Sequence, residues 1–251
     1  VVLDKHCAEA YVVLGSIAQA FEGDQVSSIR TLELAFSLKP NDINVNMWLL
    51  NAYLITGYTQ EANKIANWLV KTDPLNPSCY MMQGFALGRL GKFWDAIKPA
   101  EKAYKLSPSS PQNLCILAVT YALTNNIQAL LDLNTNDLPD STPLGLALLF
   151  QSAFKNDRES FRKIMSDEFI KSCHRDPDFS LWVAEAFCVL KNYKEAYSWL
   201  ENAVNQGYLN YNYLKIDPFF ENIADDKRFR DIIKNVSINA LKLKDAVKEK
   251  E

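Results

Sequence analysis

The sequence contains little glycine and histidine and has no long apolar run. Of its 251 residues, 8 are glycine, 10 are proline and 2 are histidine. The scarcity of glycine and proline, which break helices, favours helix over sheet. No stretch approaches the roughly 20 apolar residues that a membrane-spanning helix needs. We therefore expect a helical protein that does not cross a membrane.

An excess of basic residues is also missing. The formal net charge is −3, whereas surfaces that bind nucleic acid usually carry clustered Lys and Arg. We expect no nucleic-acid binding through this segment. The five cysteines form no CxxC pair, which favours reduced thiols over a metal site and predicts a cytoplasmic protein.

The sequence motifs of common enzyme classes are absent as well. The sequence contains neither the HExxH pattern of zinc peptidases nor the GxxxxGK[ST] pattern of phosphate-binding loops. It also lacks the GxGxxG pattern of dinucleotide-binding folds and the GxSxG pattern of serine hydrolases. Cys173 and His174 are adjacent, but adjacent side chains at a helix end rarely point at one atom, so we interpret them as surface or capping residues. The sequence predicts no enzyme and no cofactor.

A repeated pattern takes the place of these motifs. Pro40, Pro74 and Pro108 follow one another at intervals of 34 residues, and each comes just after a short apolar and basic run. Such a run ending in proline is typical of a helix C-terminus. Gly57 and Gly91 each divide one of these two intervals, which correspond to the second and third repeat units of the chain, into two apolar-periodic halves. Each interval therefore predicts two helices joined by a glycine turn.

Small residues recur where the two helices of a unit should cross. Gly84 lies in the first helix of the third unit, and Ala62 and Ala96 lie in the second helices of the second and third units. Small side chains allow two antiparallel helices to approach closely. One helix pair cannot bury its apolar face alone, so stacking of successive units is required.

This pattern resembles the tetratricopeptide repeat (TPR), closely for residues 43–110 and well for 8–42. The resemblance implies an all-α protein, a right-handed superhelix of stacked helix-turn-helix repeats in a single solenoid over 1–251. We expect six repeats, at about 8–42, 43–76, 77–110, 111–140 (degenerate), 142–175 and 177–210.

The C-terminal part carries a second resemblance. Gln206-Gly207-Tyr208, Asp217-Pro218-Phe219 and Asp226-Lys227-Arg228-Phe229 are similar to the closing segments of bacterial multidomain TPR proteins. We expect capping helices over 211–236 and a polar terminal helix over 237–251. Leu3-Asp4-Lys5 stands where a preceding repeat would end, so we also expect the chain to be part of a longer protein.

In TPR proteins the first helix of each repeat lines a concave, peptide-binding groove. Carried over to this sequence, the groove positions are Asn44, Met47, Asn51, Leu54, Ile55, Met81, Phe85, Arg89, Cys115, Val119, Leu123 and Phe150. The set is apolar, and Met47, Ser78 and Met82 stand where the basic clamp for acidic chaperone tails would be expected, so we predict no such clamp. The groove is either open to an amphipathic helix or apolar peptide, or filled by the chain's own helices.

The resemblance therefore implies a non-enzymatic scaffold that binds a peptide or partner helix in its groove. The alternative is the regulatory or sensory domain of a bacterial winged-helix transcription regulator, cyclase or kinase whose effector domain precedes residue 1. Self-association through the first repeat is a further expectation, because an uncapped repeat exposes apolar surface.

Overall fold

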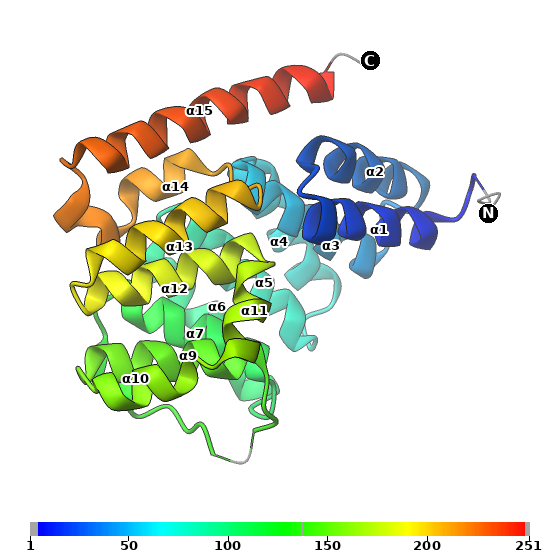
Figure 1. Ribbon diagram of the computed structural model, residues 1–251. Helices are drawn as coiled ribbons and strands as arrows, with labels where there is room; N and C mark the ends of the chain where they lie inside the picture. The colour runs from blue at the N-terminus through cyan, green and yellow to red at the C-terminus, as the bar shows by residue number, and fades with distance from the viewer. Residues whose placement is uncertain (1–4, 137, 249–251) are drawn as a thin grey trace.

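The chain is an all-α helical repeat. The computed structural model describes residues 5–136 and 138–248, without the side chain of Phe21. Leu3, Asp4 and the last three residues of the expected terminal helix lie outside this range. Helices pair along the chain as antiparallel hairpins that stack side by side (Figure 1). None of the described helices combines the length and apolar character that a membrane crossing requires.

Inner and outer helices alternate through six hairpins. The inner helices are α1 (Ala8–Ile17), α3 (Ile43–Thr56), α5 (Pro77–Arg89), α7 (Pro111–Leu123), α9 (Thr142–Phe154) and α12 (Pro177–Val189). Their partners are α2 (Gln25–Leu38), α4 (Thr59–Thr72), α6 (Phe93–Leu106), α8 (Ile127–Leu131), α10 (Arg158–Ile164) and α13 (Tyr193–Asn205). A π-helical turn, η1 (Ala18–Glu22), extends α1, and α11 (Asp167–His174) precedes α12.

Local sequence explains where the inner helices begin. Asp42, Asn76 and Asp176 each accept a hydrogen bond from a backbone N–H in the first turn of the helix that follows. Such caps satisfy N–H groups that have no partner inside the helix. Pro77 and Pro177 occupy the first helical position, where proline sacrifices no helical hydrogen bond. The starts of these three hairpins are thus set by two or three residues each.

Glycine permits both the turn and the crossing in the third hairpin. Gly91 has a φ of +77°, in the left-handed region that other residues rarely adopt. A β-carbon on Gly84 would lie 3.3 Å from the backbone nitrogen of Ala100. The close approach of the α5 and α6 backbones therefore leaves little room for a side chain at residue 84.

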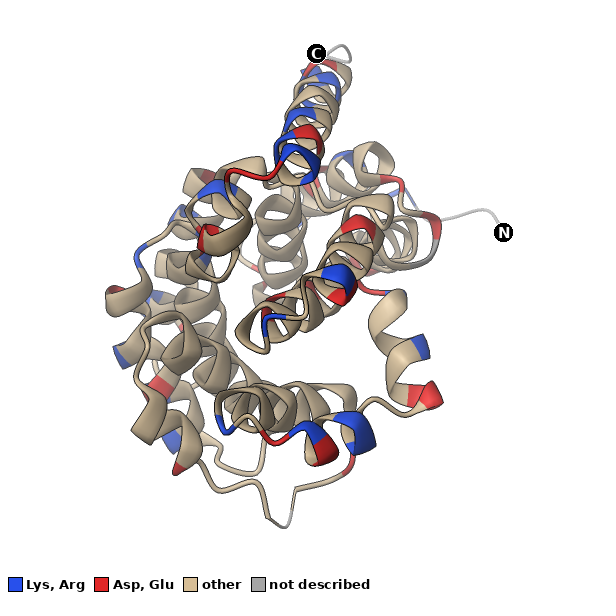
Figure 2. Ribbon diagram, turned by 60° about the vertical axis from the view of Figure 1, so that its left-hand side comes forward, with Lys and Arg blue, Asp and Glu red and all other residues tan. Residues whose placement is uncertain are grey.

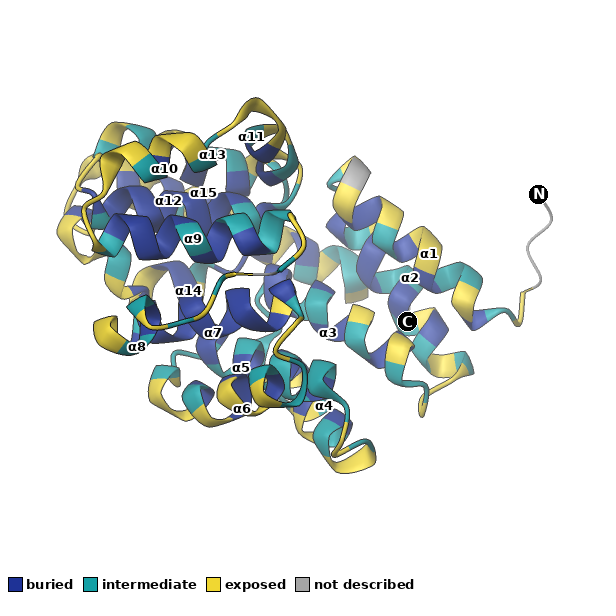
Figure 3. Ribbon diagram, turned by 90° about the horizontal axis from the view of Figure 1, so that it is seen from below, coloured by how far each residue is buried: buried dark blue, intermediate teal, exposed yellow. Residues whose placement is uncertain are grey.

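The inner helices of the later hairpins are more deeply buried than the outer helices. Eleven of the thirteen residues of α12 are buried, whereas only Ala62, Ala66 and Leu69 are buried in the fourteen-residue α4. Figure 3 shows α9 and α12 dark over most of their length, with exposed faces on the outer helices. Lys, Arg, Asp and Glu lie mainly on the outer helices and turns (Figure 2). A helix that is apolar on all sides must be covered on all sides.

The C-terminal segment covers the inner layer. It comprises α14 (Tyr211–Ile216), the 3₁₀ helix η2 (Pro218–Ile223) and the long α15 (Lys227–Lys248). In Figure 1, α15 runs past α14 toward α2, and the guanidinium of Arg30 donates to the carbonyl of Ala246. The C-terminal helix thereby joins the last hairpin to the first.

The expected boundary at residue 236 does not appear in the structure, because α15 continues through it. Phe229, Ile232, Val236, Ala240 and Leu243 are all buried. They recur every three or four residues and form one apolar stripe. The segment described as a polar terminal helix therefore packs against the molecule as far as Leu243.

Candidate functional site

The twelve expected groove residues lie on α3, α5, α7 and α9, the inner helices of four successive hairpins. The structure buries half of them, and the other half stays partly or fully exposed. The buried ones are Leu54, Ile55, Arg89, Cys115, Val119 and Phe150. The accessible ones are Asn44, Met47, Asn51, Met81, Phe85 and Leu123. The second group keeps exposed surface that a partner could touch, whereas the first group keeps almost none.

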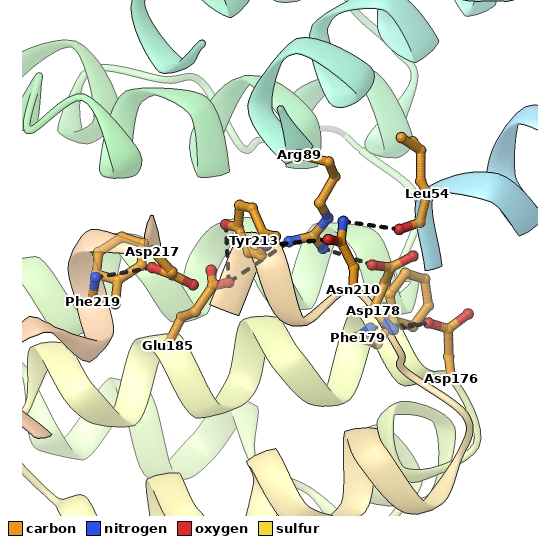
Figure 4. A network of polar contacts seen from close by, with 10 residues as sticks. All are labelled: Leu54, Arg89, Asp176, Asp178, Phe179, Glu185, Asn210, Tyr213, Asp217 and Phe219. Carbon is orange, nitrogen blue, oxygen red and sulfur yellow. Dashed lines mark hydrogen bonds and ion pairs between the residues drawn. The ribbon is translucent and has the colours of Figure 1, made fainter. Parts of the chain in front are cut away.

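The chain's own C-terminal segment fills this part of the concave face. The backbone N–H of Leu209 donates to the carbonyl of Ile55 at 2.8 Å, and the side-chain amide of Asn210 donates to the carbonyl of Leu54 at 3.1 Å. Asn210 also accepts from the N–H of Tyr213 at 3.1 Å. Residues 209–213 therefore lie across the last turn of α3 (Figure 4). The sequence left undecided whether the groove is open or filled by the chain's own helices; at Leu54 and Ile55 the chain itself fills it.

A buried ionic cluster holds α5 against α12 at the centre of the molecule. The guanidinium of Arg89 donates to Asp178 at 2.6 Å and lies 4.0 Å from the carboxylate of Glu185. The Arg89 and Asp178 side chains are 2% and 8% exposed, and that of Glu185 is fully buried. Tyr213 donates its hydroxyl to Glu185 at 3.3 Å, as Figure 4 shows. The contact therefore joins the third hairpin to the sixth hairpin and to α14.

Aromatic rings surround the same guanidinium. The Cζ atom of Arg89 lies 4.3 Å from the ring centroid of Tyr213, 5.0 Å from that of Phe85 and 5.7 Å from that of Trp182. Ring faces attract a cation, most strongly where water is excluded. The rings and carboxylates together replace the water that Arg89 loses on burial.

An apolar pocket remains open beside this cluster, on the concave side between α5 and the N-terminus of α12. Its volume is about 160 Å³. It is lined by Asn51, Met81, Met82, Phe85, Gln112, Cys115, Ile116, Pro143, Asp176, Asp178, Phe179 and Trp182. Four of these twelve, namely Asn51, Met81, Phe85 and Cys115, belong to the expected groove set.

Comparison with solved structures agrees with the repeated hairpins. The thermophilic TPR protein TTC0263 of Thermus thermophilus matches with a TM-score of 0.51 at 15% sequence identity, over 92% of this chain and 100% of that chain. The fold is that of TPR proteins. A TPR protein of Parabacteroides merdae matches over 96% of this chain and 97% of its own, at 15% identity and a TM-score of 0.47. No protein-family model and no curated protein matches the sequence.

Within this TPR fold, the Cys173–His174 pair is not arranged for nucleophilic chemistry. Cys173 is fully buried, and burial raises the pKa of its thiol well above the ordinary value. The thiolate, which is the nucleophile, is therefore disfavoured. His174 instead packs edge-on against Trp199, with 4.2 Å between ring centroids. Among the described residues, no group of three or more His, Cys, Asp or Glu side chains is placed to hold a metal ion.

The carboxyl groups of the cluster outnumber its one cation, and burial shifts their titration. Burial raises the pKa of Asp217 to about 6, and it raises that of Glu185 well above its ordinary value, with the nearby Asp217 adding to the effect. Burial and the neighbouring Asp178 raise the pKa of Asp176 to about 6. The folded TPR domain thus holds protons that the unfolded chain releases.

We expect the thermal midpoint to rise by about 2–4 °C when the pH is lowered from 7.5 to 5. A carboxyl whose folded pKa is raised destabilises the fold when it ionises, so stability is gained as the pH falls through about 6 toward the unfolded value near 4. Thermal unfolding followed by circular dichroism measures the change. Asp217→Asn is neutral at both pH values and should show a smaller rise. A midpoint that falls between pH 7.5 and 5 contradicts the assignment.

The sequence pattern identified Arg89 as an inward-facing residue but not its partners. Asp178, Tyr208, Tyr213 and Asp217 come from segments 89 or more residues further along the chain. One signal was available: Arg89 and Glu185 are ionisable residues at inward positions of otherwise apolar helices. Opposite charges in such places indicate a buried pair, because an unpaired buried charge is too costly.

Proposed function

We propose that this chain is a non-enzymatic protein-interaction scaffold whose partner binds in the open pocket between α5 and α12. The observation that carries the proposal is the pocket itself, an apolar hollow on the concave side of a TPR fold. Met81 and Phe85 of α5 remain half-buried at one wall, and Phe179 of α12 remains half-buried at the other. Partly exposed Met and aromatic side chains that converge on one hollow favour binding of a partner side chain.

The size of the pocket favours a peptide side chain over a metabolite. Pockets for drug-sized molecules usually measure about 300–1,000 Å³, and this one measures about 160 Å³. Asn51 and Gln112 at its edge carry amide groups that can pair with the backbone of an extended segment. The arrangement supports recognition of one anchoring side chain with backbone contacts beside it.

Replacing Met81 by glutamine should weaken binding of the natural partner by about tenfold or more. The substitution keeps the length of the side chain and removes its apolar end from the pocket wall. Parent and variant are used as baits in the lysate of the source cell, and the affinity of the captured partner is then measured by calorimetry. Circular dichroism of both baits confirms that they fold alike.

Leu75→Gln is the matched control. Leu75 is also apolar and is 77% exposed, but it lies in the turn between α4 and α5, away from the pocket. A partner retained by the parent and by Leu75→Gln but weakened by Met81→Gln supports the proposal. A partner that binds all three chains equally well places recognition elsewhere and contradicts it.

A further inference from the structure

The open pocket has two walls of different character. One wall is apolar and consists of Met81, Met82 and Phe85 from α5 together with Ile116 from α7. The opposite wall is the beginning of α12, which brings the carboxylates of Asp176 and Asp178 to the pocket beside the rings of Phe179 and Trp182. A partner side chain with an apolar stem and a charged end would match both walls.

Of the two carboxylates, Asp176 is the one without a cation. Asp178 is paired with Arg89 at 2.6 Å. Asp176 accepts hydrogen bonds through Oδ1 from the N–H groups of Asp178 and Phe179, both at 2.9 Å, and none of the ion pairs found between residues 5 and 248 includes it. Figure 4 shows Asp176 at the edge of the ionic cluster. Among the described residues, no hydrogen bond or ion pair involves its second oxygen, although Arg89 acts on the carboxyl electrostatically from further away.

The charge of the surroundings is negative. Among the described residues, Arg89 is the one cation that forms an ion pair with the cluster, and the acidic residues Asp176, Asp178 and Asp217 outnumber it. A second positive charge at the pocket would be attracted by the excess of carboxylate. An acidic ligand would be repelled from the same place.

The aromatic rings suit the same kind of ligand. Phe179 stacks on Trp182 with 5.8 Å between centroids, and Phe85 lies 5.7 Å from Trp182. Phe85 and Trp182 already accept one cation on the inner side, the guanidinium of Arg89. Ring faces bind Lys and Arg head groups, and the long aliphatic stems of these residues pack well on apolar surface.

We propose that the pocket between α5 and α12 binds a single Lys or Arg side chain of a partner peptide, with the stem on Met81 and Phe85 and the head group beside Asp176. This inference rests on the proposed function, since it names the residue by which the partner is anchored. It assigns to Asp176 a role in recognition in addition to its role as the cap of α12.

Three short synthetic peptides that differ at one position test the proposal. Acetylated and amidated peptides with Lys, Met or Glu at the centre of the sequence Ala-Leu-X-Leu-Ala are titrated into the ¹⁵N-labelled chain, with shift changes followed by NMR. We expect the Lys peptide to bind at least about tenfold more tightly than the Met peptide, and the Glu peptide to bind more weakly than either. Equal affinity for Lys and Met overturns the inference.

Asp176→Asn separates charge from structure. Asparagine caps a helix as well as aspartate does, so α12 should be kept while the negative charge is lost. We expect about a tenfold weaker affinity for the Lys peptide and an unchanged affinity for the Met peptide. Asp157→Asn is the matched control, because Asp157 caps α10 in the same way, through the N–H of Ser160, at an exposed site.

The natural partner distinguishes failure of this inference from failure of the proposed function. A captured partner that is weakened by both Met81→Gln and Asp176→Asn supports both. A partner weakened by Met81→Gln but not by Asp176→Asn leaves the scaffold function standing and overturns the cationic anchor. A partner unaffected by either substitution, together with absent binding of the Lys peptide, overturns both.

Discussion

Replacing Arg89 by methionine will lower the free energy of unfolding by about 3–5 kcal/mol. Arg89 is 3% exposed and is the cation closest to the buried carboxylates of Asp178 and Glu185. Methionine retains much of the stem but leaves those carboxylates in an apolar environment without a counter-ion. Chemical denaturation followed by circular dichroism measures the loss.

A triple variant tests whether charge is the cause. Arg89→Met combined with Asp178→Asn and Glu185→Gln removes all three charges together, and a neutral cluster of similar volume should recover at least half of the loss. Lys163→Met is the surface control, since Lys163 and Glu159 form an exposed ion pair at 2.8 Å with side chains 73% and 79% exposed. That substitution should cost less than about 0.5 kcal/mol. If Arg89→Met also lowers the free energy of unfolding by less than about 0.5 kcal/mol, the cluster has no structural role.

Short-range pattern was sufficient to predict the all-α repeat fold. Helix starts depend on residues such as Asp42 and Asn76, which cap the next helix two or three residues on. Turns depend on single residues such as Gly91, and helix ends depend on prolines such as Pro74. Each signal acts over a few residues, so a 34-residue period can be read from the sequence alone.

The state of the concave face depended on contacts that no local pattern contains. Asn210 pairs with the carbonyl of Leu54 across 156 positions of the chain, and Arg89 pairs with Asp178 across 89. How tightly stacked repeats curve, and whether a later segment enters the concave side, follow from small rotations added from repeat to repeat. The pattern therefore could not distinguish the groove positions that the C-terminal segment buries from those that stay exposed.

Coverage by the C-terminal segment explains why fewer residues are accessible in the candidate site than the sequence indicated. Met81 and Phe85 stay accessible because they face the hollow at the start of α12, whereas Leu54 and Ile55 lie under residues 209 and 210. Leu54 and Ile55 lie in the last turn of α3, whereas Met81 and Phe85 lie nearer the middle of α5. The C-terminal segment covers the first two residues and leaves the second two partly exposed.

Replacing Phe150 should have the second large effect on stability. The result also shows whether Phe150 is a core residue or a residue that lines an open groove. Phe150→Ala should lower the free energy of unfolding by about 3–5 kcal/mol, because the ring is fully buried and truncation leaves a cavity. A residue that lined an open groove would cost far less. Leu75→Ala, at a site 77% exposed, serves as the control and should cost less than about 0.5 kcal/mol.

Removing the Phe150 ring should also loosen the C-terminal segment. The Phe150 ring lies 5.8 Å from that of Phe219 in η2, so it couples the fifth hairpin to the segment that fills the concave face. We expect faster hydrogen exchange at the N–H groups of Leu209 and Tyr213, whose acceptors are Ile55 and Asn210. Exchange at Asn46, whose N–H bonds within its own hairpin to Asp42, should change less. Equal acceleration at all three positions would show that the variant opens the whole molecule at once and that the C-terminal segment is not a separate closing element.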